Sequence, residues 1–257
     1  MDARDAMAAA RRITVLTGAG VSTASGIPDF RGTSGLWTRL GRGDTLESYL
    51  KDPSVRRAAW RFRAEHPLWT ASPNAAHRAV ADLERAGRLR TLLTQNVDGL
   101  HQRAGSSAVV ELHGSMLGTV CADCGALGPM ADAVARVRAG EEDPDCTTCG
   151  GTLKSTAVAF GEPLDPDVLR SARVAALDCD LMLVVGTSLS VEPAAGLVGL
   201  AAQAGALVVI CNDEPTPYDG VASALVRGPV QETVPDLVAV PVVESGPVRT
   251  WGDPSTW

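Results

Sequence analysis

The segment TQNVDGLHQRAGSSAVVELHG, residues 94–114, is the stretch around which we expect the rest of the chain to be organised. Apolar residues 91–93 precede it and residues 109–112 lie inside it, and both runs predict short buried strands. Its polar residues therefore follow strand ends, where open α/β sheets bind ligands. Gln95, Asn96, Asp98 and His113 provide amides, a carboxylate and an imidazole, which can hold sugar hydroxyls and move a proton. Taken alone, the same residues also fit a polar turn and a structural histidine.

The composition narrows the class of protein. The 257 residues are 45% hydrophobic, enough for a sizeable core, and carry a net charge of -7 without a block of Lys or Arg. Nucleic acid is therefore not expected as a partner. No run approaches the roughly 18 apolar residues that span a bilayer, and residues 1–15 do not form a signal peptide. We expect a cytoplasmic protein without membrane contact, in which six cysteines favour a metal or free thiols over disulfides.

Two glycine-rich segments follow predicted strands. Residues 13–17 lead into GAGVSTASGIPDFRG, 18–32, and residues 181–185 lead into GTSLSVEPAAGL, 186–197. Glycines after a strand let the backbone approach a phosphate, and a following helix start adds its N–H groups. The first segment has the spacing G-x-G-x5-G and lacks the second strand and acidic residue of a standard dinucleotide fingerprint. A dehydrogenase is thus disfavoured, while a phosphate loop of another nucleotide enzyme and a plain strand–helix turn both remain.

Four cysteines form two C-x-x-C pairs, and each pair is followed by a glycine. The pairs are 21 residues apart and consist of Cys121, Cys124, Cys146 and Cys149. Four thiolates at this spacing are typical of a closed structural zinc site, with a redox dithiol as the alternative. We therefore predict a zinc ion that holds structure and takes no part in chemistry.

Strands and helices alternate over 13–31, 75–112 and 165–211, which predicts a doubly wound, Rossmann-like parallel sheet. We assign 8–32, 74–114 and 158–240 to this sheet domain. Residues 33–73 and 115–157 form an inserted small module, part helical and part zinc ribbon, and 241–257 form a loosely packed tail. Within these parts we expect a loop over 33–54, a helix over 55–70 with Val55, Ala59 and Phe62 on its apolar face, and a strand over 154–160.

Seven motifs in one order resemble the sirtuin family of NAD-dependent protein deacylases over residues 13–237. They are the two C-x-x-C pairs, counted as one motif, and GAGVSTASGIPDFRG, TQNVDGLH, ELHG, VAFGE, GTSLSVEPAA and CNDEPTP. The resemblance implies an enzyme that moves an acyl group from lysine to ADP-ribose and releases nicotinamide. It implies NAD and zinc as cofactors and acyl-lysine proteins or peptides as partners, with acyl-CoA synthetases as one class.

The resemblance also implies roles for individual residues. His113 would be the general base on a ribose hydroxyl, Asn96 would orient the ribose and a water, and Asp98 would position nicotinamide or its loop. The substrate backbone would pair with Val158, Phe160, Gly161, Glu162 and Val191. The cofactor would be bound by Gly18, Ala19, Gly20, Ser22, Thr23, Asp29, Phe30, Arg31, Trp37, Gln95, Asn96, Val97, Asp98, Gly186, Thr187, Ser188, Asn212, Asp213, Glu214 and Val230.

Residues 60–63 leave the choice of acyl group open. Family members that remove succinyl or malonyl groups carry Tyr-x-x-Arg at this place, whereas this chain has Trp60 and Arg63. We expect Arg63 to be an exposed helix charge, and Asp29 to favour acetyl over succinyl. Ser155 stands where the family often has proline. The alternatives to a deacetylase are a desuccinylase or other deacylase, a mono-ADP-ribosyltransferase, and a nucleotide-sensing or zinc-ribbon interaction module without catalysis.

Overall fold

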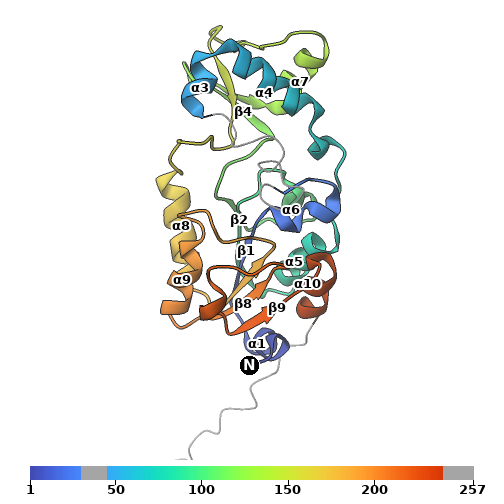
Figure 1. Cartoon of the computed structure of the whole chain (residues 1–257), viewed down its shortest axis with the longest axis vertical. Helices are drawn as coiled ribbons and strands as arrows, with labels where there is room; N and C mark the ends of the chain where they lie inside the picture. The colour runs from blue at the N-terminus through green and yellow to red at the C-terminus, as the bar shows by residue number, and fades with distance from the viewer. Residues whose placement is uncertain (30–44, 240–257) are drawn as a thin grey trace, which may run out of the picture.

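The computed structural model describes residues 1–29 and 45–239. It has two parts, one above the other along the long axis of the molecule (Figure 1). The larger part contains a six-stranded sheet, and the smaller part contains a three-stranded sheet with its own helices. The predicted residues Phe30, Arg31 and Trp37 and the tail 241–257 lie outside the described residues.

The larger sheet is parallel throughout, with strand order β3-β2-β1-β7-β8-β9. Its central strands β1 and β7 are buried along their whole length because helices cover both faces of the sheet, and this explains their unbroken apolar sequences. The strands are β1 (Ile13–Thr17), β2 (Leu89–Thr94), β3 (Val109–Glu111), β7 (Leu181–Val185), β8 (Leu207–Cys211) and β9 (Ala224–Val226). The predicted doubly wound sheet is confirmed.

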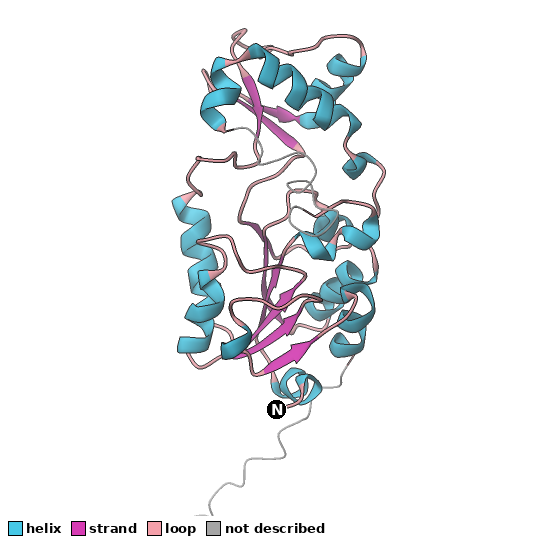
Figure 2. Cartoon of the chain, in the orientation of Figure 1, coloured by secondary structure: helices cyan, strands magenta, loops and turns pink. Residues whose placement is uncertain are grey.

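Helices form a layer on each face of this sheet (Figure 2). One layer and its apolar core include α1 (Ala3–Ala9), α5 (Ala75–Arg85) and α10 (Val230–Val238), and the other includes α8 (Pro166–Leu177) and α9 (Gly196–Gln203). Side chains cap the starts of two of these helices. Asn74 accepts a hydrogen bond from Ala76 N (3.0 Å), and Asp165 accepts one from Asp167 N (2.7 Å) ahead of a proline at the first helical position.

The small module contains helices and a three-stranded sheet of the zinc-ribbon type. Its antiparallel strands, in the order β5-β4-β6, are β4 (Gly118–Cys121), β5 (Leu127–Pro129) and β6 (Leu153–Ser155). They pack with α4 (Pro53–Glu65) and α7 (Met130–Arg138), while α3 (Leu46–Lys51) precedes α4. Trp60 is fully buried here beside Met130, Cys121 and Cys146. The core of this module is therefore separate from the two cores of the large sheet.

Several local predictions were wrong. Residues 46–51 are helical where we expected loop, since Thr45 caps them by accepting from Ser48 N (3.1 Å). The buried side of α4 carries Trp60 and Ala64, one helical turn apart, and Phe62 is 41% exposed. The strand expected over 154–160 ends at Ser155. Two short 3-10 turns, Ala19–Val21 and Thr23–Ser25, replace the helix expected after β1.

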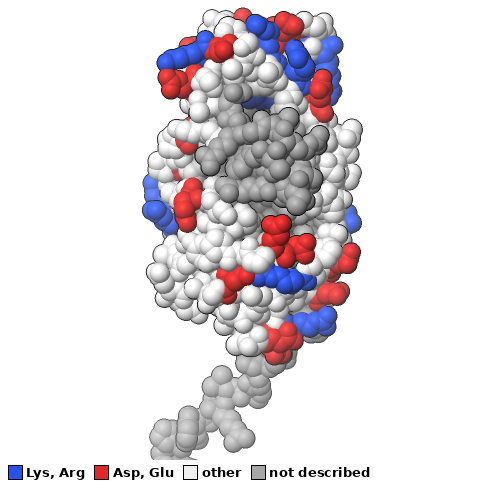
Figure 3. Space-filling view, in the orientation of Figure 1, with Lys and Arg blue, Asp and Glu red and all other residues white. Residues whose placement is uncertain are grey.

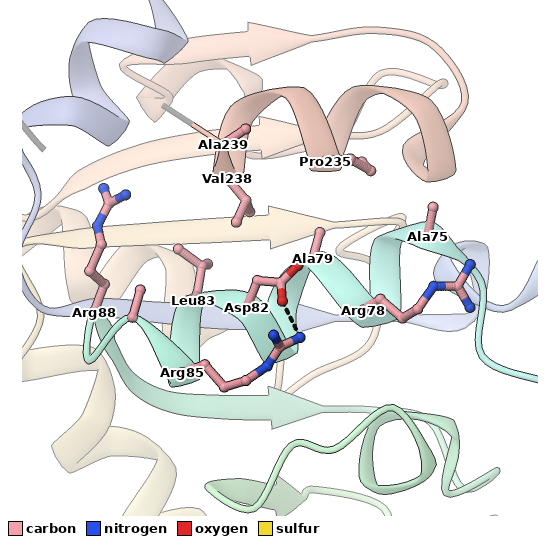
Figure 4. A pocket seen from close by; sticks show the side chains of 11 residues that line it. Ala75, Arg78, Ala79, Asp82, Leu83, Arg85, Arg88, Pro235, Val238 and Ala239 are labelled. Atoms are coloured by element: carbon pink, nitrogen blue, oxygen red, sulfur yellow. Dashed lines mark ion pairs between the residues drawn. The ribbon is translucent and has the colours of Figure 1, made fainter. Parts of the chain in front are cut away.

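A groove of about 570 Å³ lies between α5 and α10 (Figure 4). Its walls combine small apolar residues with Arg78, Arg85 and Arg88, and Arg85 is paired with Asp82. On the face drawn in Figure 3, basic and acidic side chains are interspersed at both ends of the molecule. Among the helices in residues 1–29 and 45–239, none is both long and apolar enough to span a bilayer.

Candidate active site

The two glycine loops meet where the order of the sheet reverses, between β1 and β7. Gly18 N donates to Val185 O (3.1 Å) and Gly20 N donates to Gly186 O (2.8 Å). A Cβ on Gly186 would lie 2.4 Å from Val21 N, and its φ of +59° also favours glycine. These glycines are thus required where the two loops touch, and the loops together line the switch point where such sheets bind ligands.

The end of β2 is fixed against both loops. Gln95 Nε2 donates to Thr187 Oγ1 (3.0 Å), and Gln95 N donates to Thr17 O (3.0 Å). Asn96 is buried and held twice, because its backbone N donates to Thr94 Oγ1 (3.1 Å) and its Nδ2 donates to Ser22 Oγ (3.2 Å). The amide of Asn96 therefore has a defined position at the switch point.

Asp98 uses both carboxylate oxygens within the protein. Ser22 Oγ donates to Oδ2 (2.7 Å) and Leu100 N donates to Oδ1 (2.9 Å), which places the carboxylate at the start of α6 (Leu100–Arg103). Such a buried and fully engaged carboxylate orders the loop around it. Ser22 thus links Asp98 to Asn96, which lie 76 and 74 positions after it in the sequence, respectively.

His113 has a defined tautomer. Its Nδ1 lies 3.0 Å from Gln95 O, and because a carbonyl only accepts, Nδ1 carries the proton. Nε2 of the neutral ring then keeps its lone pair and can accept a proton. Burial lowers the pKa of His113, and the hydrogen bond to Gln95 opposes this only in part. The ring is therefore neutral at pH 7, the state that a general base needs.

The predicted substrate segment 158–162 is attached to both parts of the molecule. Val158 N donates to His113 O (2.9 Å), and Leu46 N donates to Phe160 O (3.1 Å). Glu162 accepts from Ala159 N (3.0 Å) and forms an ion pair with Lys154 Nζ of β6 (3.0 Å). Val191 lies in the loop before α9, where its carbonyl accepts from Ala195 N (3.0 Å).

The remaining predicted cofactor residues lie on two sides of the switch point. Thr23 is exposed and donates to Gly20 O (3.0 Å), while Ala19, Asp29 and Ser188 are half-buried and Val97 follows Asn96. Past β8, Asn212 Nδ2 donates to Glu214 O (2.8 Å), and Arg227 Nη1 donates to the carbonyls of both residues. Asp213 and Glu214 are exposed, and Val230 is buried at the start of α10.

Sequence reasoning missed two buried histidines next to these residues. His77 Nδ1 accepts from Asn74 N (3.3 Å), and its Nε2 lies 3.4 Å from Ser22 Oγ. The ring of His101 lies 4.7 Å from that of His77 and contacts Thr17. Burial lowers the pKa of His77 to about 4 and that of His101 to about 3, so both are neutral at pH 7. The available signal was His77 at the third position after the Asn74 cap, where a capping box forms.

The four predicted cysteines come together in the small module. Their sulfurs all lie within 4.8 Å of one another, with 3.6 Å between Cys121 and Cys149 and 3.8 Å between Cys124 and Cys146. A tetrahedral zinc with Zn–S bonds of about 2.3 Å requires sulfurs about 3.8 Å apart. The donor set and its spacing fit zinc, and all four positions are filled by protein, as in a structural site.

Arg63 was predicted wrongly as an exposed helix charge. Its guanidinium lies over the rings of Tyr49 (5.2 Å) and Trp60 (4.9 Å), and burial lowers its pKa. Nη1 of Arg63 and Nε1 of Trp60 are both buried, and neither has a hydrogen-bond partner within the described residues. The cause is its position three residues after Trp60, which puts both side chains on one side of α4.

The class of protein follows from these features. Paired glycine loops at the switch point of a parallel sheet, with a neutral histidine beside them, indicate a nucleotide-binding α/β protein. The four cysteines indicate a separate structural metal module. Comparison with protein families then identifies the particular group. The model of the Sir2 family matches residues 18–193, and the chain belongs to this family.

Curated relatives match nearly the whole chain. "NAD-dependent protein deacetylase 2" of Streptomyces coelicolor is 53% identical over 231 residues, which are 88% of this chain and 96% of that protein. "NAD-dependent protein deacetylase" of Thermodesulfovibrio yellowstonii is 41% identical over 87% of this chain and 88% of that protein. "NAD-dependent protein deacylase 2" of Pyrobaculum aerophilum is 42% identical over 93% and 94%, respectively.

Solved structures agree in fold. A structure described as "Structural Basis for the Mechanism and Regulation of Sir2 Enzymes" has a TM-score of 0.84 and 40% identity, covering 92% of this chain and 94% of that one. A Sir2 complex with p53 peptide and NAD⁺ has a TM-score of 0.81 and 35% identity, covering 91% and 94%. The predicted Sir2-type fold is confirmed.

Proposed function

We propose that this chain is an NAD-dependent protein lysine deacetylase, which transfers the acyl group of acyl-lysine to ADP-ribose with release of nicotinamide. The relatives that match most of the chain carry the names of NAD-dependent deacetylases and deacylases. The observation that carries the proposal is the tautomer of His113, whose Nδ1 donates to Gln95 O and whose Nε2 can accept a proton. A protein that only bound nucleotide would have no need of such a base.

The residues at the switch point suit this chemistry. NAD, when bound, supplies the ribose that takes the acyl group. His113 removes a proton from a ribose hydroxyl at Nε2, and Asn96 orients the ribose from a position fixed by Ser22 and Thr94. Asp98, held by Ser22 and Leu100 N, would position nicotinamide or its loop. Segment 158–162 is held by the hydrogen bond from Val158 N to His113 O, and it pairs with the peptide backbone of the substrate.

Zinc would be held by Cys121, Cys124, Cys146 and Cys149 and would stabilise the module that adjoins segment 158–162. With four protein ligands it supplies structure alone. None of the six cysteines is in a disulfide within the described residues, which supports our proposal that the protein works in the cytoplasm. As protein substrates we propose acyl-CoA synthetases, on the basis of the resemblance to bacterial sirtuins.

The test is mass spectrometry of matched acetyl-lysine and succinyl-lysine peptides incubated with the protein, with and without NAD. We expect NAD-dependent loss of acetyl with release of nicotinamide. His113→Ala should keep the thermal unfolding profile and NAD affinity of the wild type and lose at least 100-fold in turnover, as removal of a general base does. Full activity of His113→Ala, or transfer of ADP-ribose to protein without deacylation, contradicts the proposal, and the latter outcome favours the transferase.

A second candidate, removal of acidic acyl groups, is favoured by one observation. The buried Nη1 of Arg63 has no partner within the described residues, and an arginine can bind a carboxylate through two parallel hydrogen bonds. For a desuccinylase, Arg63→Met would abolish succinyl removal and spare acetyl removal. Arg61→Met, at an exposed position of the same helix, is the matched control. Equal loss of both activities in Arg63→Met would assign Arg63 to the stability of the small module.

A further inference from the structure

A chain of hydrogen bonds connects His101 to Asn96 through the ends of two strands. His101 Nε2 lies 3.0 Å from Thr17 Oγ1, Thr17 Oγ1 donates to Thr94 Oγ1 (2.8 Å), and Thr94 Oγ1 accepts from Asn96 N (3.1 Å). Thr17 and Thr94 are the last residues of β1 and β2 and are paired in the sheet. Each of the four residues is at least 90% buried, so solvent cannot replace these contacts.

Each hydrogen bond in this series has a defined donor and acceptor. Thr17 gives its single hydroxyl proton to Thr94, so its oxygen must accept from His101, and Nε2 of the neutral ring therefore carries the proton. Nδ1 is left as a bare acceptor, and it is indeed buried without a partner in the part of the chain that the structure describes. A histidine that served only to fill the core would make no such directed contact, and leucine would replace it without the cost of burying a polar atom.

We propose that His101 is a positioning residue for Asn96. By donating from Nε2 it fixes the hydroxyl of Thr17, which in turn keeps Thr94 Oγ1 available to the backbone N–H of Asn96. This inference rests on the proposed function, because it assumes that Asn96 contacts the ribose of NAD. A displacement of Asn96 by a fraction of an ångström would weaken that contact and leave the peptide segment 158–162 unchanged.

The test compares His101→Met with His101→Gln. Methionine keeps bulk and removes the donor, whereas the amide of glutamine can place an N–H near the position of Nε2. We expect His101→Met to raise the Kd for NAD, measured by calorimetry, and to lower kcat/KM for NAD, each about 5- to 30-fold, with the peptide KM changed less than twofold. His101→Gln should restore most of the NAD affinity.

Thr17→Val tests whether His101 acts through Thr17. It removes the same link and should give the same loss, and the double variant with His101→Met should be no weaker than either single variant. Thr91→Val on β2, where the hydroxyl donates to the adjacent carbonyl of Arg90, is the matched control. Additive losses, or a His101→Met variant with wild-type affinity for NAD, would overturn the proposal. If His101→Met does not fold, Thr17→Val is compared with His101→Gln instead. Tighter binding of NAD by His101→Gln than by Thr17→Val then supports the proposal.

Failure of the proposed function would be seen separately. Wild-type protein that binds NAD and releases no nicotinamide from acyl-lysine peptides removes the deacylase, while the Kd series still decides on His101. A ¹⁵N NMR spectrum reports the tautomer directly, and a proton on Nδ1 of His101 would contradict the inference whatever the enzyme does. Wild-type protein without affinity for NAD overturns both.

Discussion

His113 and the two buried histidines beside the site differ in the contacts that fix their protons. His113 donates from Nδ1 to a backbone carbonyl, which leaves Nε2 as the base, whereas His77 accepts at Nδ1 from the backbone N of Asn74. Burial lowers the pKa of each ring. One residue type thus gives a proton acceptor at the site and rigid neutral groups behind it.

The pH dependence of turnover follows from His113. Because burial lowers its pKa below the usual 6.5, the ring stays neutral, and active as a base, at pH values where an exposed histidine would be protonated. We expect kcat/KM for NAD to be constant from pH 8 to about 6.5 and to fall on a single acid limb below that. An acid limb centred above pH 6.5 would show that another group is the base.

Acid stability should depend on His77 and His101. Their pKa values of about 4 and about 3 in the folded protein lie below the unfolded value of about 6.5, so the unfolded chain binds protons that the folded chain does not. Their contribution is complete above pH 6.5 and is lost as pH falls toward 4 and 3, by about 1.4 kcal/mol per pH unit for each ring. Urea unfolding between pH 7 and 4.5 measures this slope, and His77→Gln should reduce it. A slope that is the same in His77→Gln would contradict the assignment.

At the scale of elements, segment 158–162 takes its conformation from three neighbours. Its backbone is bonded to His113 and to the start of α3, and its carboxylate Glu162 is paired with Lys154 of β6. The side chains of this ion pair are only 15% and 24% exposed, so removal of one partner leaves a poorly solvated charge. The ribbon that contains the cysteines thus contributes directly to the shape of the predicted substrate segment.

Lys154→Met should therefore raise the KM for acyl-lysine peptide by about tenfold or more, the loss expected for one charged hydrogen bond, and leave the KM for NAD unchanged. The chain has two lysines, which makes Lys51→Met the natural control. Lys51 pairs with Glu47 on the surface, where both side chains are about three-quarters exposed, and its loss should have little effect. Steady-state kinetics with each substrate varied in turn decides this, and equal changes in both KM values would contradict a local role.

At the scale of the whole molecule, the sheet and the ribbon have separate cores, so they should respond differently to loss of the metal. The division of the chain into 8–32, 74–114 and 158–240 against 33–73 and 115–157 stays a prediction. It agrees with the described strands, because the large sheet takes its strands from the first set of residues and the small sheet from the second.

Removal of zinc by a chelator should lower the thermal midpoint and abolish deacylation while the affinity for NAD is largely retained. The site is closed by four thiolates, and binding of such a metal is part of the folding free energy. Metal analysis should find one zinc per chain, and Cys149→Ala should reproduce the effect of chelation. Cys179→Ala changes a buried cysteine outside the cluster and is the control, in which the protein should keep its zinc. An unchanged midpoint in the chelated protein would contradict a structural role.

Features that depend on the local order of residues could be predicted from the sequence. Unbroken apolar runs predicted β1, β2 and β7, and two C-x-x-C pairs predicted the metal cluster. These follow from the sequence because a strand and a pair of ligands each form within a few neighbouring residues. The motif order was likewise enough for the family.

The contacts that hold the site together could be seen only in the folded protein. The contact between Thr17 and His101 joins residues 84 positions apart, and the bond between Ser22 and Asp98 joins residues 76 apart. The side of α4 that is buried, and with it the environment of Arg63, was also set by packing against the cysteine ribbon. Such contacts depend on which strand ends become neighbours when the sheet forms, and no local pattern in the chain records that arrangement.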